Sequence, residues 1–255
     1  MNLIPNWLHR LASPPTFYGF VSRVQPGLAV VTVLLLGYGL FGGLWLAPAD
    51  YQQGEGFRII YVHVPAAWMS LFIYSLMAGA SVVALVWRIK LAECVLTSCA
   101  PIGASFTALA LVTGMLWGKP MWGTYWTWQD ARLVSELILL FLYLGVVGLQ
   151  QAIADPRAAA RACALLAIVG FVNVPIVHYS VEWWNTLHQG PSLTKFDKPS
   201  IDASMLWPLL SMALGFTTFF VKVLFTRVQN ELLWRERGNP WVVGAALAAK
   251  SSRDE

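Results

Sequence analysis

Residues 59–87 read I-I-Y-V-H-V-P-A-A-W-M-S-L-F-I-Y-S-L-M-A-G-A-S-V-V-A-L-V-W and contain no Asp, Glu, Lys or Arg. About 20 apolar helical residues, each rising about 1.5 Å, cross a hydrocarbon layer of about 30 Å. The run is longer than that, and it lacks the alternating polarity of strands in a membrane barrel. It therefore predicts a transmembrane helix.

Five more uncharged windows of at least 18 residues flank this run, at 24–49, 94–118, 137–154, 162–181 and 203–221. Only 12% of the 255 residues are charged and the mean hydropathy is +0.59, whereas soluble domains carry about 25% charged residues. We therefore expect an all-α integral membrane protein, with residues 1–255 forming a single six-helix membrane domain. The predicted helices cover residues 26–46, 59–87, 94–117, 131–153, 162–181 and 203–222.

Lys and Arg predict the orientation, because cytoplasmic loops carry more of them than outer loops do. With six helices, both termini lie on one side. Placing the termini inside assigns twelve basic residues to the cytoplasm: Arg10, Arg23, Arg88, Lys90, Arg157, Arg161, Lys222, Arg227, Arg235, Arg237, Lys250 and Arg253. The outer side receives five: Arg58, Lys119, Arg132, Lys195 and Lys198. The net charge of +4 thus reflects topology and does not indicate nucleic-acid binding. Segments 117–136 and 182–202 are predicted to be periplasmic.

The outer segment 117–136 is unusually rich in aromatic residues: W-G-K-P-M-W-G-T-Y-W-T-W-Q-D-A-R-L-V-S-E. Its rings are Trp117, Trp122, Tyr125, Trp126 and Trp128. Trp and Tyr favour the membrane–water boundary, but an aromatic belt needs only one or two rings per helix end. This density is more typical of a platform for a large, planar, apolar ligand.

Two histidines accompany the aromatic residues on the outer side. His63 lies near the outer end of the second span, and His188 lies in the second outer segment. Imidazole is a strong ligand of haem iron, and haem propionates pair well with Arg or Lys. Arg58, Arg132 and Lys119 are on the same side. The pattern predicts an outward-facing haem site.

Each of these residues also has a simpler interpretation. Taken singly, histidines placed like His63 and His188 are more often interfacial side chains than ligands, and His178 is either a reserve ligand or an interfacial or packing residue. Asp130 precedes an apolar run, where an aspartate commonly caps a helix.

Glu136 lies within a span, where a carboxyl group is costly without a partner. We expect it to face the bundle or an aqueous cleft, with Arg132, Ser135 or backbone as its partner. The three cysteines, Cys94, Cys99 and Cys163, lie in or beside spans, and no C-x-x-C-H motif occurs. Neither a disulfide framework nor covalent haem attachment to this chain is indicated.

The sequence W-G-T-Y-W-T-W-Q-D-A-R-L-V-S-E-L-I-L-L-F-L-Y-L-G at 122–145 resembles the tryptophan-rich "WWD" signature of haem-handling membrane proteins. Segments R-I-I-Y-V-H-V-P-A-A-W-M-S (58–70) and V-E-W-W-N-T-L-H-Q-G (181–190) resemble the two flanking histidine segments of the C-type haem exporters of bacterial cytochrome c maturation. The similarity covers essentially all six spans.

This resemblance implies that haem b is held at the outer face of the bacterial inner membrane, with His63 and His188 as axial ligands. The implied wall of the site consists of Trp117, Trp122, Trp126, Trp128 and Asp130. The implied function is delivery of haem to a membrane-anchored periplasmic haem chaperone, to which it becomes covalently attached. Further implied partners are an ABC-type ATPase, a B-type membrane subunit and a small single-span D-type subunit. The role is that of a haem-handling factor and not of an enzyme.

The chain departs from the family pattern W-x-W-D-A-R-L-T at Gln129, which stands between Trp128 and Asp130. Val134 replaces the usual Thr, and Tyr125 stands where Trp is usual. One extra residue in a helix rotates everything beyond it by about 100°, whereas a loop absorbs it locally.

Two alternative functions remain at this level. A membrane b-type cytochrome usually holds haem between histidines on facing helices, but His188 falls in a loop. A transmembrane haem transporter needs a polar path through the bundle, and the spans carry few polar groups at mid-depth.

Overall fold

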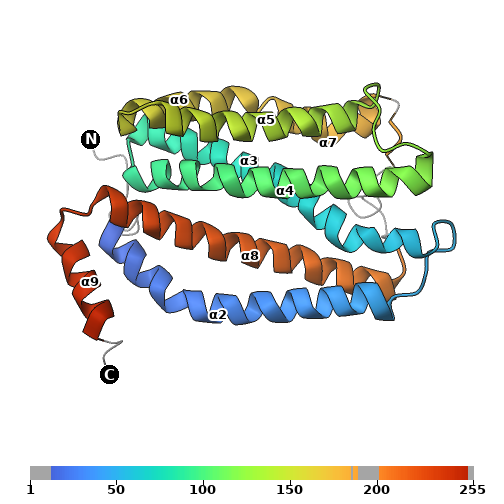
Figure 1. The fold of residues 1–255 in the computed structure, drawn as a ribbon, viewed down its shortest axis with the longest axis horizontal. Coiled ribbons are helices and arrows are strands. Elements are labelled where there is room, and N and C mark those ends of the chain that lie inside the picture. The colour runs from blue at the N-terminus through green and yellow to red at the C-terminus, as the bar shows by residue number, and fades with distance from the viewer. Residues whose placement is uncertain (1–12, 185, 189–200, 252–255) are drawn as a thin grey trace.

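The computed structural model describes residues 13–184, 186–188 and 201–251. Apart from one isolated β-bridge between Asp50 and Gly54, the regular secondary structure in these ranges is helical (Figure 1). The elements are α2 (Pro14–Phe41), the π-helical η1 (Gly42–Leu46), the 3₁₀-helical η2 (Glu55–Ile59), α3 (Ile60–Trp87), α4 (Lys90–Trp122), α5 (Ala131–Ala152), α6 (Pro156–Gly170), α7 (Asn173–Trp183), α8 (Ala203–Arg235) and α9 (Pro240–Ser251).

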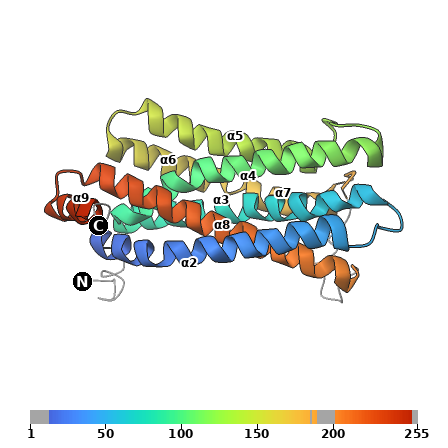
Figure 2. The same ribbon diagram turned by 60° about the horizontal axis from the view of Figure 1, so that its bottom comes forward.

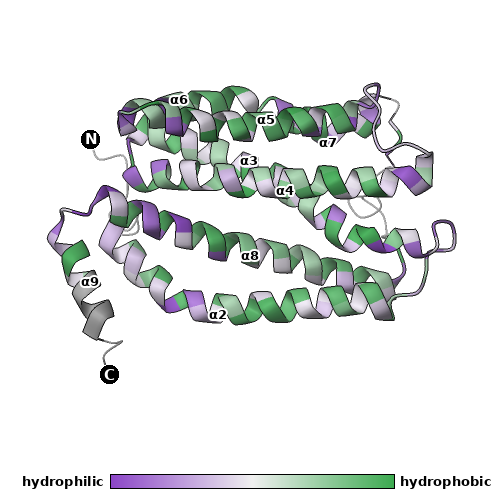
Figure 3. Ribbon diagram, in the orientation of Figure 1, coloured by the Kyte–Doolittle hydropathy of each residue, from purple (hydrophilic) through white to green (hydrophobic). Residues whose placement is uncertain are grey.

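Within the residues that the structure describes, six helical segments are long and apolar enough to cross a membrane, as expected for the predicted all-helical integral membrane protein. They are Pro14–Leu46, Glu55–Trp87, Lys90–Trp122, Ala131–Ala152, Pro156–Trp183 and Ala203–Arg235. Hydrophobic residues follow the length of the bundle, and hydrophilic residues gather toward its two ends (Figure 3). Large apolar side chains such as Val33, Phe141 and Val169 are exposed on the outside of the bundle, where lipid replaces water as their solvent.

The helices extend beyond several of the predicted spans. Helix α2 begins at Pro14, upstream of residue 26, because proline is well accommodated in a first turn, where amide groups have no helical partner. Helix α8 continues to Arg235, past residue 222. The predicted spans are shorter because hydropathy marks only the part of a helix that is apolar enough for lipid. Charged residues then extend the same helix into the aqueous layer.

The fifth span is interrupted between α6 and α7, at Phe171 and Val172. Pro175 explains the break, since it has no N–H for the Phe171 carbonyl and its ring collides with the residue four positions earlier. The break is stabilised by Asn173, whose side-chain amide donates to the Ser135 carbonyl of α5 at 2.9 Å. The kink thus fastens α7 to the first turns of α5.

Helices α3 and α4 run antiparallel through the middle of the bundle. Helices α2 and α8 pack on one side of them and α5 with α6 on the other (Figures 1 and 2). Because successive spans alternate in direction, the start of α3, the end of α4, the start of α5 and the end of α7 meet at one end of the bundle, at the right of Figure 1. The candidate site lies at this end.

Candidate functional site

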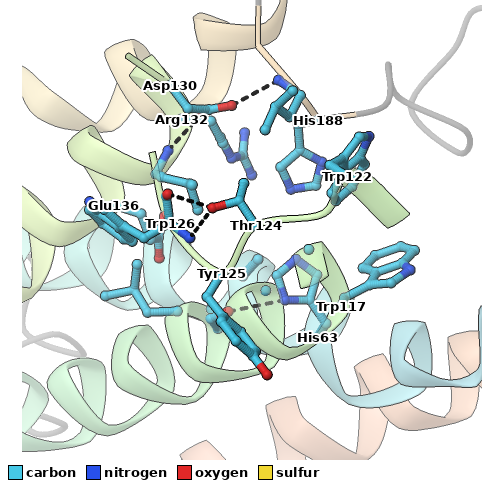
Figure 4. A pocket seen from close by; sticks show the side chains of 17 residues that line it. His63, Trp117, Trp122, Thr124, Tyr125, Trp126, Asp130, Arg132, Glu136 and His188 are labelled. Atoms are coloured by element: carbon cyan, nitrogen blue, oxygen red, sulfur yellow. Dashed lines mark hydrogen bonds between the residues drawn. The ribbon is translucent and has the colours of Figure 1, made fainter. Parts of the chain in front are cut away.

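A pocket opens where α3, α4, α5 and the segment after α7 converge (Figure 4). Its space amounts to about 650 Å³ when the open mouth and the solvent in it are included. The lining includes His63, Trp117, Trp122, Thr124, Tyr125, Trp126, Asp130, Arg132, Glu136, Leu187 and His188. Two imidazoles and four large aromatic rings from distant parts of the sequence therefore share one concave surface.

His63 projects from the second turn of α3 and is only 6% exposed. Its Nδ1 lies 3.1 Å from the Ala110 carbonyl oxygen and 3.0 Å from the Thr113 hydroxyl, both on α4. A carbonyl oxygen only accepts hydrogen bonds, so Nδ1 carries the hydrogen and Nε2 keeps its lone pair. A histidine fixed in this way presents a ready metal-ligating nitrogen.

The α4 backbone comes close to this ring at Gly114. A Cβ atom at that position would lie 3.1 Å from His63 Cε1, tighter than ordinary van der Waals contact. Trp117, one turn further along α4, meets the same ring edge to face, with centroids 5.6 Å apart. His63 is thus enclosed by α4 on two sides.

His188 reaches the pocket from a non-helical segment after α7 and is half-buried. Burial is the largest of three causes, with the positive charges of Arg132 and of a protonated His63, that together lower the pKa of this imidazole to about 3. The ring is therefore neutral near pH 7 and offers a free nitrogen lone pair.

The His63 and His188 rings face each other with centroids 5.8 Å apart and planes inclined by 29°. A neutral imidazole binds a metal through the nitrogen lone pair in the plane of its ring, and both rings bring such a nitrogen to the same pocket. The donor set of the pocket therefore suits a metal centre that takes two imidazole ligands.

Three tryptophans line the pocket. Trp117 is buried and donates its indole N–H to the Gln53 side chain at 2.9 Å, and its ring lies 6.3 Å from that of Trp122. Trp126 belongs to the loop between α4 and α5, and its buried Nε1 has no hydrogen-bond partner among the described residues. An unpaired buried N–H is costly, so this group is suited to a polar atom of a ligand.

The loop that carries Trp126 is held by local hydrogen bonds. Helix α4 ends at Trp122 and is followed by the C-cap residue Gly123, whose φ of 78° favours glycine. Thr124 then donates its hydroxyl to the Trp126 carbonyl at 2.8 Å and accepts the Trp126 amide N–H at 3.2 Å. This turn directs Tyr125 and Trp126 toward the pocket (Figure 4).

Asp130 is 3% exposed and makes two hydrogen bonds with backbone amides. Oδ1 accepts from Leu133 N at 3.0 Å and thereby caps α5, as its position before the apolar run indicates. Oδ2 accepts from Leu187 N at 2.8 Å. The second bond ties the residue beside His188 to the tryptophan-rich loop.

Arg132 and Glu136 lie on the α5 side of the pocket. Arg132 donates from Nη1 to the Val177 carbonyl at 2.8 Å, which leaves further N–H groups of the guanidinium for other acceptors. Glu136 is buried and accepts the Ser70 hydroxyl on Oε1 at 2.7 Å. Among the described residues its Oε2 has no hydrogen-bond partner. Ser70, and not Ser135, is therefore its hydrogen-bonded neighbour.

Several residues predicted for the site do not line the pocket. Trp128 is 70% exposed and packs edge to face on Trp126. Arg58 donates to the Gly43 and Ala47 carbonyls and pairs with Glu55, so it joins η1 to η2. Lys119 is exposed beside Tyr125, and His178 is exposed against Tyr179.

Other residues that help to form the pocket have no feature in the sequence that marks them as part of a site. Thr113 and Gly114 belong to an apolar span in which threonine and glycine are common packing residues. Gln53, which accepts the Trp117 N–H, lies in a short polar loop. Leu187 contributes through its backbone N–H and not through its side chain. Their roles depend on contacts between distant segments.

Gln129 lies in the loop, is exposed, and accepts the Thr127 hydroxyl on its side chain. The extra residue therefore falls before the Asp130 cap, and the register of α5 beyond the cap is independent of it.

Comparison with known proteins adds independent information. A family model described as "Heme exporter protein C" matches residues 7–243. Heme exporter protein C of Haemophilus influenzae is 52% identical over 244 residues, which cover 96% of this chain and 99% of the relative. The protein of that name from Escherichia coli K12 is 51% identical over 92% of this chain and 94% of its own length. The one from Bradyrhizobium diazoefficiens is 50% identical over 95% of this chain and 91% of its own length.

Proposed function

The chain belongs to the Heme exporter protein C family, and from that premise we propose that its pocket binds haem b between His63 and His188 and presents it to a periplasmic haem chaperone. The observation that carries the proposal is the facing pair of imidazoles, 5.8 Å apart, in a pocket lined by tryptophans. The absence of a C-x-x-C-H motif is consistent with haem that is held without covalent bonds and later handed on.

The two imidazoles would supply the axial nitrogens, His63 through Nε2 because its Nδ1 is engaged by α4. Bound haem would add the capacity of its iron to take ligands above and below a planar macrocycle. Trp117, Trp122 and Trp126 would cover the apolar surface and exclude water. These residues are suited to such a group because indole rings offer flat apolar faces.

The polar groups of the pocket suit the two propionates. Arg132 lines the pocket and, among the described residues, donates to one carbonyl only, and Trp126 offers a buried N–H. Both favour a carboxylate. The charged edge of haem would therefore be oriented toward Arg132.

We place the site at the periplasmic face of the bacterial inner membrane, on the basis of the positive-inside bias of the sequence. There a membrane-anchored chaperone would receive the haem, and an ABC-type ATPase with its B-type and D-type membrane subunits would complete the system. Surrounding lipid contacts the apolar exterior of the bundle.

The first test is the absorption spectrum of the purified protein supplied with haem, oxidised and reduced. Wild type is expected to show a low-spin bis-imidazole spectrum, and both His63→Ala and His188→Ala should lose it. His178→Ala is the matched control, since His178 is exposed and outside the pocket. Wild-type haem content and spectra in both pocket variants would refute the ligand assignment.

Two further readouts separate the competing functions. Covalent labelling of a co-expressed chaperone should require both pocket histidines if haem is presented to it. Reversible electron exchange with a quinol and no haem transfer would instead indicate a b-type cytochrome, and haem movement across sealed vesicles would indicate a transporter.

A further inference from the structure

We propose that the two histidines have unequal roles: His63 is the ligand that stays in place, His188 is the ligand that departs when haem leaves, and Asp130 is the positioning residue that holds His188 in the pocket. The proposal rests on the proposed function and adds the order in which the site opens. The two rings face each other in the pocket, but the structures that hold them differ.

His63 is part of a continuous helix and is anchored to a second helix. Its backbone lies inside α3, its Nδ1 is bonded to Ala110 and Thr113 of α4, and Gly114 leaves it no lateral space. Rotating this ring out of the pocket requires breaking its hydrogen bond to α4, and moving its backbone requires separating α3 from α4 or unwinding the first turns of α3. Separating or unwinding these helices disrupts the packed centre of the bundle.

His188 lies in a non-helical segment that follows α7. Helix α7 ends at Trp183, and the described residues 186–188 have no helical hydrogen bonds. The described contact that holds their backbone is the bond from Leu187 N to Asp130 Oδ2, at 2.8 Å. Among the described residues, releasing this bond removes the backbone contact of the His188 segment and leaves the hydrogen bonds of the helices in place.

The two carboxylate oxygens of Asp130 accept different hydrogen bonds, and the two bonds can be tested separately. Oδ1 caps α5 through Leu133 N, and Oδ2 receives Leu187 N. An asparagine retains one acceptor oxygen for the cap but turns an NH₂ donor toward the Leu187 N–H, so the second bond cannot form. Since asparagine is as good an N-cap as aspartate, Asp130→Asn with its oxygen on the cap preserves α5 and removes the tether, and continued protection of Leu133 reports this orientation.

The matched control is Asp155→Asn. Asp155 caps α6 through Ala158 N at 2.7 Å, at the opposite end of the bundle. Asp155→Asn replaces a carboxylate by an amide in a helix N-cap, as Asp130→Asn does, but Asp155 does not line the pocket. Leu187→Pro is a second pocket variant, because proline lacks the amide hydrogen that Asp130 accepts.

The first experiment is hydrogen–deuterium exchange of the haem-free, full-length protein in detergent. A peptide that covers Leu187 should exchange at least about tenfold faster in Asp130→Asn than in wild type, because a hydrogen bond to a charged group contributes about one to two powers of ten to an equilibrium constant. Leu133 should stay protected, and Asp155→Asn should match wild type around Leu187. Unchanged exchange around Leu187 in Asp130→Asn would overturn the proposed role of Asp130.

The second experiment uses the haem-loaded protein. Asp130→Asn and Leu187→Pro should each show a high-spin fraction that added free imidazole converts to low spin, and haem transfer to apomyoglobin should be about tenfold faster than in wild type. A loss of haem caused only by unfolding would not respond to imidazole. If wild type is low-spin and both variants behave like it, the unequal roles are refuted while the proposed function stands. If wild type takes up no haem, the proposed function itself fails.

Discussion

The imidazole rings of His63 and His188 lie 5.8 Å apart, although the first belongs to helix α3 and the second follows helix α7. Each ring is positioned by a different neighbour. His63 is held by side-chain and backbone atoms of α4, and His188 is held through the backbone bond of Leu187 to Asp130. Substitutions in α4 beside His63 should therefore change the properties of bound haem without acting through His188.

Thr113→Val removes one of the two acceptors of the His63 Nδ1–H. We expect the spectrum of bound haem to remain low-spin, because Ala110 still accepts the hydrogen bond. The ligand becomes less basic, so the ferric form loses stabilisation and the reduction potential rises. A bond of about 1 kcal/mol, at about 59 mV per tenfold change for one electron, corresponds to tens of millivolts. A spectroelectrochemical titration measures the shift, and Thr113→Ser should restore the wild-type value. An equal shift in both variants would contradict this role of the hydroxyl.

Gly114→Ala should displace the His63 ring, because the added Cβ would lie 3.1 Å from Cε1 and the ring is fixed by its hydrogen bonds. We expect weaker haem retention and an altered absorption spectrum. Gly79→Ala is the control: Gly79 lies in α3 and has no atoms within 4 Å of an added Cβ. The control should leave the haem spectrum unchanged and should not destabilise α3, since alanine is the better helix former by about 1 kcal/mol. Equal spectra for Gly114→Ala and wild type would refute the steric prediction.

Gln53→Leu deprives the buried Trp117 N–H of its acceptor. An unpaired buried donor costs about 1–3 kcal/mol, so thermal unfolding in detergent should occur at a lower temperature and haem should dissociate faster. Gln53→Glu keeps an acceptor and should behave nearly as wild type. The neighbouring Gln52 is exposed, and Gln52→Leu provides the control. Identical effects of the two leucine substitutions would show that the bond to Trp117 is unimportant.

The opposite end of the bundle should respond to acid through Glu236. Burial raises the pKa of this carboxyl, but hydrogen bonds from Lys90, Trp241 and Asn239 outweigh burial and hold the pKa below its ordinary value. The folded state thus binds the proton less readily than the unfolded state. The stabilisation of α9 is complete above about pH 4.5 and declines as the pH falls through the lowered pKa.

Hydrogen exchange of an α9 peptide between pH 3 and 6, corrected for the intrinsic rate, measures this effect. Glu236→Gln should reduce protection at pH 6 and abolish the acid-dependent loss. An acid-dependent loss that persists in Glu236→Gln would assign the titration to another group.

The sequence by itself determined the membrane class, the number of spans and the end of the bundle at which the aromatic and histidine residues gather. Hydropathy along the chain suffices for this, because a helix satisfies its own backbone and must only be apolar over the thickness of the bilayer. The Asp130 cap was predictable for a similar reason, since capping involves neighbouring residues only.

Only the tertiary structure decided which of those residues meet. His63, His188 and Trp126 line one pocket, whereas Trp128 and Arg58 lie outside it. In a membrane, lipid and protein interior are both apolar, so hydropathy along a span scarcely marks the side that faces the bundle. The rotation of each helix about its axis, and the pairing of Asp130 with a backbone N–H far along the chain, follow from packing between helices. That packing depends on all of the spans together.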